Sequence, residues 1–203
     1  MVEKQKVEGM KKEELLAKIK RNITTQYEMP SIDDIHPITY ADPLKQFMEV
    51  TQVVGGKVML LKEGDNTDIN SIVKKLHPDA KQIASELPEV TIATINPNTV
   101  KEANELNGTD VAVLKGVFGV AENGCVWIPQ TMKEKAVCFI SEQLVIILNR
   151  KDIVNNMHEA YSRIKLNDYG YGCFISGPSK TADIAQALVM GAQAARGVTV
   201  VII

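Results

Sequence analysis

The chain has 203 residues, of which 45% are hydrophobic, so it is long enough to bury the core of one substantial domain. Its formal net charge of -2 argues against a surface for nucleic acid or for an anionic membrane. No stretch approaches the roughly 20 continuous apolar residues of a membrane span, and the Lys- and Glu-rich start lacks a signal-peptide core. We therefore expect a cytoplasmic protein without a nucleic-acid or membrane partner.

The first 43 residues are predicted to form an N-terminal helical arm and a linker. Apolar residues recur at helical spacing between Lys and Glu residues over 11–23, which predicts an amphipathic helix. Three prolines between residues 28 and 43 then predict an irregular segment. We accordingly expect an arm and linker over 1–43 and one domain over 44–203.

Helical and strand-like segments alternate along the rest of the chain. The predicted helices span 44–54, 68–76 and 151–164, and 99–107 is predicted as a short helical or turn segment. The predicted strands span 57–61, 82–84, 91–95, 136–139, 144–148, 173–175 and 197–203, with a hairpin over 110–128. This alternation predicts an α/β fold with a mixed, mostly parallel sheet and helices on both of its faces.

The cysteines and histidines are dispersed along the sequence. Cys125, Cys138 and Cys173 form no Cys-x-x-Cys pair, and the histidines lie equally far apart. Metal and iron–sulfur sites need clustered ligands. We therefore expect no metal and no cofactor in this chain, and three reduced, structural thiols.

The first candidate site is a turn near the end of the chain, where strand 173–175 is followed by a predicted helix. Pro178 suits a turn or a first helical position, and Ser179 is a plausible helix cap. Backbone N–H groups, hydroxyls and a lysine at one helix start make this turn a candidate anion site. The candidate ligand-binding residues are Ser176, Gly177, Ser179, Lys180, Thr181 and Asp183. The alternative is a well-capped helix after a sheet strand, which is common in α/β proteins.

The second candidate site is the turn Glu122-Asn123-Gly124, which two β-rich runs flank. Asn-Gly between such runs is the strongest short hairpin signal. A glutamate at a tight turn can act as a general acid or base, so Glu122 is the candidate catalytic residue, with Asn123 and Gly124 as ligand-binding neighbours. The alternative is a solvated turn residue without a chemical role.

Three sequence runs resemble the LUD-domain family. They are Gly119-Val-Ala-Glu-Asn-Gly124, Ile175-Ser-Gly-Pro-Ser-Lys-Thr-Ala-Asp-Ile184 and residues 47–58, which are similar to the family's early helix-to-strand junction. The resemblance extends over about 47–203. The chain departs from the family in three places. Gly191-Ala-Gln-Ala-Ala-Arg-Gly197 stands where members commonly have Gly-Val-His-Gly-Pro. Asn123 replaces the usual threonine or serine of the middle motif, with Cys125 after Gly124, and residues 129–135 replace a charged or glycine-rich connection.

The resemblance implies both a fold and a function. The fold is that of sugar-phosphate isomerases and CoA transferases, a group that includes 5-formyltetrahydrofolate cyclo-ligase. The function is that of a lactate-utilisation protein C-like accessory or subunit protein, which supports oxidation of L-lactate to pyruvate beside separate iron–sulfur partner proteins. The two candidate sites would then contact a carboxylate substrate or a partner chain.

Two alternatives remain open. In the first, the chain is an independent enzyme for a phosphorylated, nucleotide or CoA-linked small molecule. Ser179, Lys180 and Thr181 would then bind the phosphate, and Glu122 would act as acid, base or nucleophile. Otherwise it is a sensor or scaffold without turnover. Fold analogy does not determine chemistry, and sequence alone does not indicate whether the two turns meet in space.

Overall fold

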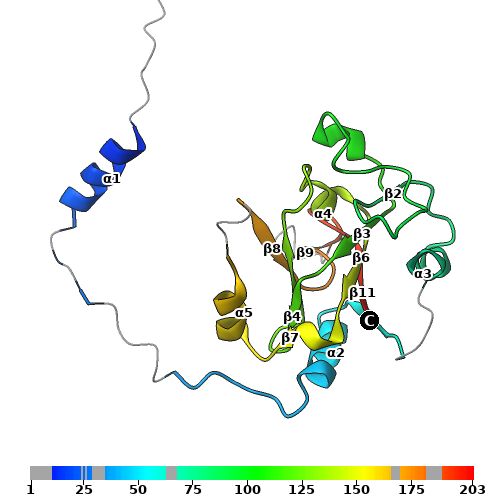
Figure 1. The fold of residues 1–203 in the computed structure, drawn as a ribbon, viewed down its shortest axis with the longest axis horizontal. Coiled ribbons are helices and arrows are strands. Elements are labelled where there is room, and N and C mark those ends of the chain that lie inside the picture. Colours follow the sequence, from blue (N-terminus) through cyan, green and yellow to red (C-terminus); the bar gives the residue numbers. More distant parts are fainter. Residues whose placement is uncertain are drawn as a thin grey trace, which may run out of the picture. The chain divides into compact units, whose positions relative to one another are not determined.

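The structure, a computed structural model, describes residues 11–23, 25, 27–28, 35–62, 68–165, 170–181 and 189–203 (Figure 1). The chain divides into two compact units, Met1–His36 and Pro37–Ile203. The first contains helix α1 (Lys12–Arg21), which agrees with the helix predicted over 11–23. Acidic residues in its first turn and basic residues in its last turn complement the helix dipole. None of the helices in the described ranges is long and apolar enough to cross a membrane.

The second unit contains short helices joined to two main sheets. Helix α2 (Pro43–Val53) begins where the Asp42 carboxylate accepts a 3.0 Å hydrogen bond from the Lys45 N–H, and it ends before Gly55, whose φ is 90°. The other helical elements are α3 (Ile69–Leu76), α4 (Val137–Ile140) and α5 (Met157–Arg163), with 3₁₀ helices η1 (Ala103–Leu106) and η2 (Arg150–Asp152).

The larger sheet has five strands in the order β1-β11-β6-β3-β2, and every pairing in it is parallel. Strands β3, β6 and β11 are its inner strands and lie side by side (Figure 1). They are almost wholly apolar, as parallel strands covered on both faces require. The five strands are β1 (Lys57–Leu60), β2 (Ile83–Ala84), β3 (Val111–Lys115), β6 (Gln143–Leu148) and β11 (Gly197–Ile202).

Helices cover both faces of this sheet. On one face Leu114 and Ile146 share a core cluster with Phe47 of α2 and Val137 of α4. On the other face Val113 and its neighbours pack with α3. The connection from β1 to β2 crosses the whole sheet, and the later connections step back one strand at a time. Right-handed crossovers therefore place α3 on one face, and η1 and α4, which lie in the later connections, on the other. The predicted α/β fold, with a mostly parallel sheet, is confirmed.

The predicted Asn-Gly hairpin is also confirmed, but it belongs to a second sheet with the strand order β7-β4-β5-β8. Val126 and Ile128 of this sheet point into the core shared with the parallel sheet, and Trp127 packs on the opposite side. The two sheets therefore enclose one core between them. The strands are β4 (Phe118–Val120), β5 (Cys125–Pro129), β7 (Ile153–Val154) and β8 (Gly172–Ile175).

Three predicted elements in the middle of the chain differ in the structure. Residues 136–139 were expected as a strand, but they belong to α4, where the Ile140 N–H bonds to the Ala136 carbonyl at 2.9 Å. A short apolar run has no periodicity that separates strand from helix. The helix expected over 151–164 is η2, β7 and α5, because the Asn156 side chain caps α5. Residues 91–95 form turns with one β-bridge, between Ala84 and Ile95.

The helix predicted to start at Ser179 is also wrong at its first residues. Strand β9 (Lys180–Thr181) pairs antiparallel with β10 (Val189–Met190). The backbone of Ser179 bonds to the carbonyl of Ala195 at 2.8 Å and to the N–H of Gly191 at 3.0 Å, so it belongs to a network between neighbouring segments and not to a helix start. Residues 182–188, with the candidate ligand residue Asp183, lie outside the described residues.

Candidate functional site

The three runs that carry the family resemblance meet at one place in the second unit. The hydroxyl of Ser176 donates a 2.8 Å hydrogen bond to the carbonyl of Asn123. The carbonyl of Gly124 accepts a long hydrogen bond of 3.5 Å from the hydroxyl of Thr51, in the last turns of α2. A Cβ atom on Gly177 would lie 2.8 Å from the carbonyl oxygen of Val54. Both candidate turns therefore contact each other and close on the carboxyl end of α2.

Glycine is needed at both turns for two physical reasons. Gly124 and Gly177 have φ values of 65° and 63°, in the left-handed region that other residues rarely adopt. Each also faces α2 without room for a side chain, since a Cβ on Gly124 would lie 2.8 Å from the N atom of Thr51. The glycines thus permit close backbone contact between elements that are far apart in sequence.

Glu122 contacts a helix start. Its carboxylate accepts a 2.9 Å hydrogen bond from the N–H of Met157, the first residue of α5. Its own N–H bonds to the carbonyl of Asn155 at 3.0 Å. A carboxylate at this position stabilises the helix through the helix dipole. Glu122 is exposed and is not among the residues that line the cavity described next.

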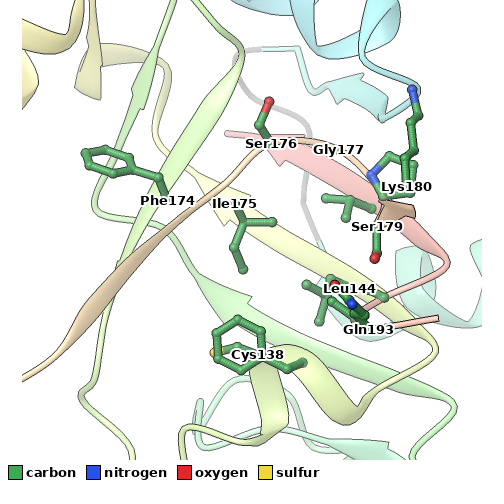
Figure 2. Close-up of a pocket in the computed structure, with 14 residues that line it drawn as sticks. Cys138, Leu144, Phe174, Ile175, Ser176, Gly177, Ser179, Lys180 and Gln193 are labelled. Carbon is green, nitrogen blue, oxygen red and sulfur yellow. The ribbon is translucent and has the colours of Figure 1, made fainter. Parts of the chain in front are cut away.

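A cavity of about 380 Å³ lies beside the Ser176 turn (Figure 2). It opens between the end of β8, helix α4, the first residues of β6 and β11, and residues 193–195. Its apolar wall consists of Cys138, Phe139, Leu144, Phe174, Ile175 and Val198. Its polar lining consists of Ser176, Ser179, Lys180 and Gln193.

The polar side chains point in different directions. Figure 2 shows the Ser179 hydroxyl directed toward Leu144 and Gln193, and the Lys180 side chain directed away from Cys138. The Lys180 ammonium lies beside Gly55, where an added Cβ would be 3.1 Å from Nζ. Gly55 follows α2, whose carboxyl end has partial negative charge. Lys180 is therefore placed both at the rim of the cavity and against the end of α2, and of Thr181 the structure describes only its backbone in β9.

The cavity has a polar and an apolar part. Its lining contains hydroxyl, amide, thiol and ammonium groups, and among the described residues neither a carboxylate nor an imidazole lines it. Across the ranges that the structure describes, no three His, Cys, Asp or Glu residues gather as a metal site. An apolar wall with a few polar groups is the usual form of a small-molecule site.

Sequence reasoning identified Ser176, Ser179 and Lys180 but missed most of the cavity. Cys138 and Phe139 were assigned to a strand, and Gln193 had no local signal. Leu144 and Val198 are the second residues of β6 and β11, so the cavity lies near the amino-terminal ends of these strands. Open parallel sheets usually bind ligands at the carboxyl ends, so the usual rule points to the edge of the sheet opposite this cavity.

Comparison with known proteins agrees with this fold. A crystal structure of a DUF162 family protein from Deinococcus radiodurans is similar, with a TM-score of 0.59 and 13% sequence identity. The match covers 82% of this chain and 99% of that chain, and at this identity it concerns the fold alone. A search of curated proteins found no match. The LUD domain model matches residues 10–203. The chain therefore belongs to the LUD-domain family, as its three sequence runs predicted.

Proposed function

We propose that this chain is a lactate-utilisation protein C-like subunit. In this role it supports the oxidation of L-lactate to pyruvate by separate iron–sulfur partner proteins, which carry the redox centres. The observation that carries this proposal is LUD-family membership over residues 10–203. The contact between Ser176 and Asn123 supports it further, because it joins the family-like runs in one surface.

The size and lining of the cavity favour an accessory role over direct lactate chemistry. Its volume of about 380 Å³ falls in the range of roughly 300–1,000 Å³ that suits ligands much larger than a three-carbon acid. Among the described residues that line it there is no carboxylate or histidine to take a proton from a hydroxy acid. In this proposal the partner proteins remove the hydride or electrons from lactate. The two joined turns of this chain contact those partners.

The test uses cells of the source organism that lack this chain. Growth on L-lactate and lactate-dependent dye reduction in cell extract should both fall, and the purified full-length chain should restore dye reduction. Gly177→Ala should restore less than Gly108→Ala. Both glycines have positive φ, but an added Cβ meets Val54 only at Gly177 and nothing within 4 Å at Gly108. Undiminished lactate oxidation without the chain would overturn the proposal.

A second candidate function is independent binding of a phosphorylated, nucleotide or CoA-linked molecule. The specific observation in its favour is the cavity, with an apolar wall and the Lys180 ammonium at its rim. A melting-temperature panel with lactate, pyruvate, ATP, ADP, a sugar phosphate, a CoA thioester and a reduced folate tests it. A ligand at about 100 times its Kd stabilises by roughly 2.7 kcal/mol, which raises Tm by several degrees.

The matched variants for this panel are Lys180→Ala and Lys151→Ala. Both remove an exposed lysine, but only Lys180 lines the cavity. A shift with a phosphate-bearing ligand that disappears in Lys180→Ala and persists in Lys151→Ala favours the independent binding protein. No shift with any ligand favours a subunit whose site is completed by its partners.

A further inference from the structure

A second cavity adjoins the one beside the Ser176 turn. Its volume is about 350 Å³, and it shares Phe139, Gln193 and Ala194 with the first cavity. We call the first the apolar cavity, after its wall, and the second the polar cavity. The polar cavity is otherwise lined by the end of α4, by residues 141–142 just before β6, and by residues of the segment 191–196. Because the cavities have lining residues in common, one ligand can reach both.

The segment 191–196 separates the two cavities and is tied to the fold at both ends. Each of its residues lines at least one of the cavities. The N–H of Gly191 donates a 3.0 Å hydrogen bond to the carbonyl of Ser179. At the other end, the N–H of Arg196 donates a 2.8 Å hydrogen bond to the carbonyl of Glu142. The backbone bonds therefore hold this segment beside both cavities, and it is one of the places where the chain departs from the family pattern.

Two opposite charges lie in the polar cavity without pairing. The carboxylate of Glu142 and the guanidinium of Arg196 both line it, and both residues are exposed. Their backbones are joined, but within the described ranges neither side chain forms an ion pair or a hydrogen bond. A ligand with a single charge is attracted by one of these groups and repelled by the other. A zwitterion is attracted by both.

An exposed aromatic ring lies where the two cavities meet. Phe139 lines both of them and is 37% exposed, although Val137 and Cys138 of the same short helix are buried. Beyond this ring lies the wall of the apolar cavity. An apolar group that extends from the polar cavity would therefore cover Phe139 and remove apolar surface from water on both sides of the contact.

We propose that the joined cavities bind a free α-amino acid with an apolar side chain, of the kind of leucine or phenylalanine. The guanidinium of Arg196 binds the α-carboxylate, for which its planar pair of N–H donors is suited. The carboxylate of Glu142 accepts hydrogen bonds from the α-ammonium. The side chain of the ligand passes Phe139 and enters the apolar cavity.

This site differs from both functions considered above. Lactate has no ammonium group for Glu142, and a phosphate group would be repelled by that carboxylate. A phosphate-bearing ligand would depend on Lys180, which lines only the apolar cavity, whereas the amino acid depends on Glu142 and Arg196. The proposal therefore holds whether or not the chain supports lactate oxidation, and its test does not use that reaction.

Isothermal titration calorimetry of the full-length chain with L-phenylalanine and L-leucine tests the proposal. Two analogues isolate the charges, since 3-phenylpropanoate lacks the ammonium and 2-phenylethylamine lacks the carboxylate. Each should bind at least about tenfold more weakly than L-phenylalanine, because it loses one charge-assisted interaction and still meets a charge of its own sign.

Matched variants assign the binding to the polar cavity. Arg196→Gln and Glu142→Gln should each weaken the binding of L-phenylalanine by about tenfold. Their midpoints of urea unfolding should remain near that of the wild type, because neither side chain has a partner among the described residues. Arg163→Gln and Glu89→Gln remove exposed charges that line neither cavity, and they should bind as the wild type does.

Three results would overturn the proposal. The first is the absence of binding by both amino acids up to about 10 mM, a concentration at which even a millimolar Kd is measurable. The second is equal affinity for L-phenylalanine and either single-charge analogue. The third is binding that persists in Arg196→Gln and Glu142→Gln but disappears in Lys180→Ala, which would place the ligand in the apolar cavity alone.

Discussion

The hydroxyl of Ser176 and the carbonyl of Asn123 are joined by a 2.8 Å hydrogen bond across 53 residues of sequence. This bond connects the turn after β8 to the hairpin turn between β4 and β5. Together with the contacts of Gly124 and Gly177 on α2, it makes the two turns one continuous surface. Substitutions at these residues can therefore distinguish a residue that only stabilises this surface from one that takes part in the chemistry.

Ser176→Ala removes the connecting hydrogen bond. We expect the free energy of unfolding to fall by about 0.5 kcal/mol, the low end for a hydrogen bond, because Ser176 is exposed. Urea denaturation measures the change, and Ser162→Ala is the control, since its hydroxyl bonds only locally to the Glu159 carbonyl. A loss above about 2 kcal/mol would contradict a single exposed bond.

Gly177→Ala and Gly108→Ala separate backbone strain from crowding. Both positions have positive φ, 63° and 78°, so each alanine should cost about 1–2 kcal/mol. Gly177→Ala should cost about 1–3 kcal/mol more, because its Cβ presses on the Val54 carbonyl. Equal midpoints of urea unfolding for the two variants would show that the end of α2 moves away from the added Cβ with no loss of stability.

Glu122→Gln tests whether this carboxylate is structural. The glutamine keeps an oxygen for the Met157 N–H but loses the charge at the start of α5, so we expect a loss of about 0.3–1 kcal/mol in stability. Restoration of lactate-dependent dye reduction should be unchanged. The exposed Glu89→Gln is the control for loss of charge. If the variant is as stable as the wild type but fails to restore dye reduction, Glu122 has a chemical role.

His77 should make the stability dependent on pH. Burial and the positive charge of Lys57 lower its pKa below the usual 6.5, and its Nε2 is buried with no hydrogen-bond partner among the described residues. Protonation is therefore harder in the folded than in the unfolded chain. The contribution of neutral His77 to the free energy of unfolding is complete above about pH 6.5. It decreases as the pH falls toward the lowered pKa of the folded state.

Denaturant unfolding at pH 7.5 and pH 5.5 measures this effect. The wild type should lose stability at the lower pH, and His77→Gln should lose less. His158→Gln, at an exposed histidine, is the control and should follow the wild type. An identical fall in the wild type and His77→Gln would assign the dependence to other groups.

The parts of the fold with strong local signals were predictable. Pro43 and the Gly55-Gly56 pair mark the ends of α2, and Asn123-Gly124 specifies a hairpin because both residues suit its tight turn. The buried strands β6 and β11 are recognisable in the sequence as continuous apolar runs. These signals depend only on neighbouring residues in the sequence, so they can be read without knowledge of the tertiary structure.

Segments with ambiguous local preference took the structure that their surroundings imposed. The apolar residues of α4 could have formed a strand, but their partners are side chains of the core and not a free sheet edge. Ser179 and Lys180 resemble a helix start, yet Ser179 bonds to Ala195 and Lys180 pairs in β9. In such segments, tertiary hydrogen bonds outweigh propensities of less than about 1 kcal/mol per residue.

Local patterning was sufficient for the α/β class, the hairpin, the apolar inner strands and the family, because each is written in neighbouring residues. It could not determine that Ser176 reaches Asn123 or that Glu122 contacts α5. Those relationships arise from the packing of the second sheet against the parallel one. Packing depends on long-range contacts, whose energy is shared among many residues and leaves no signal in any one short stretch.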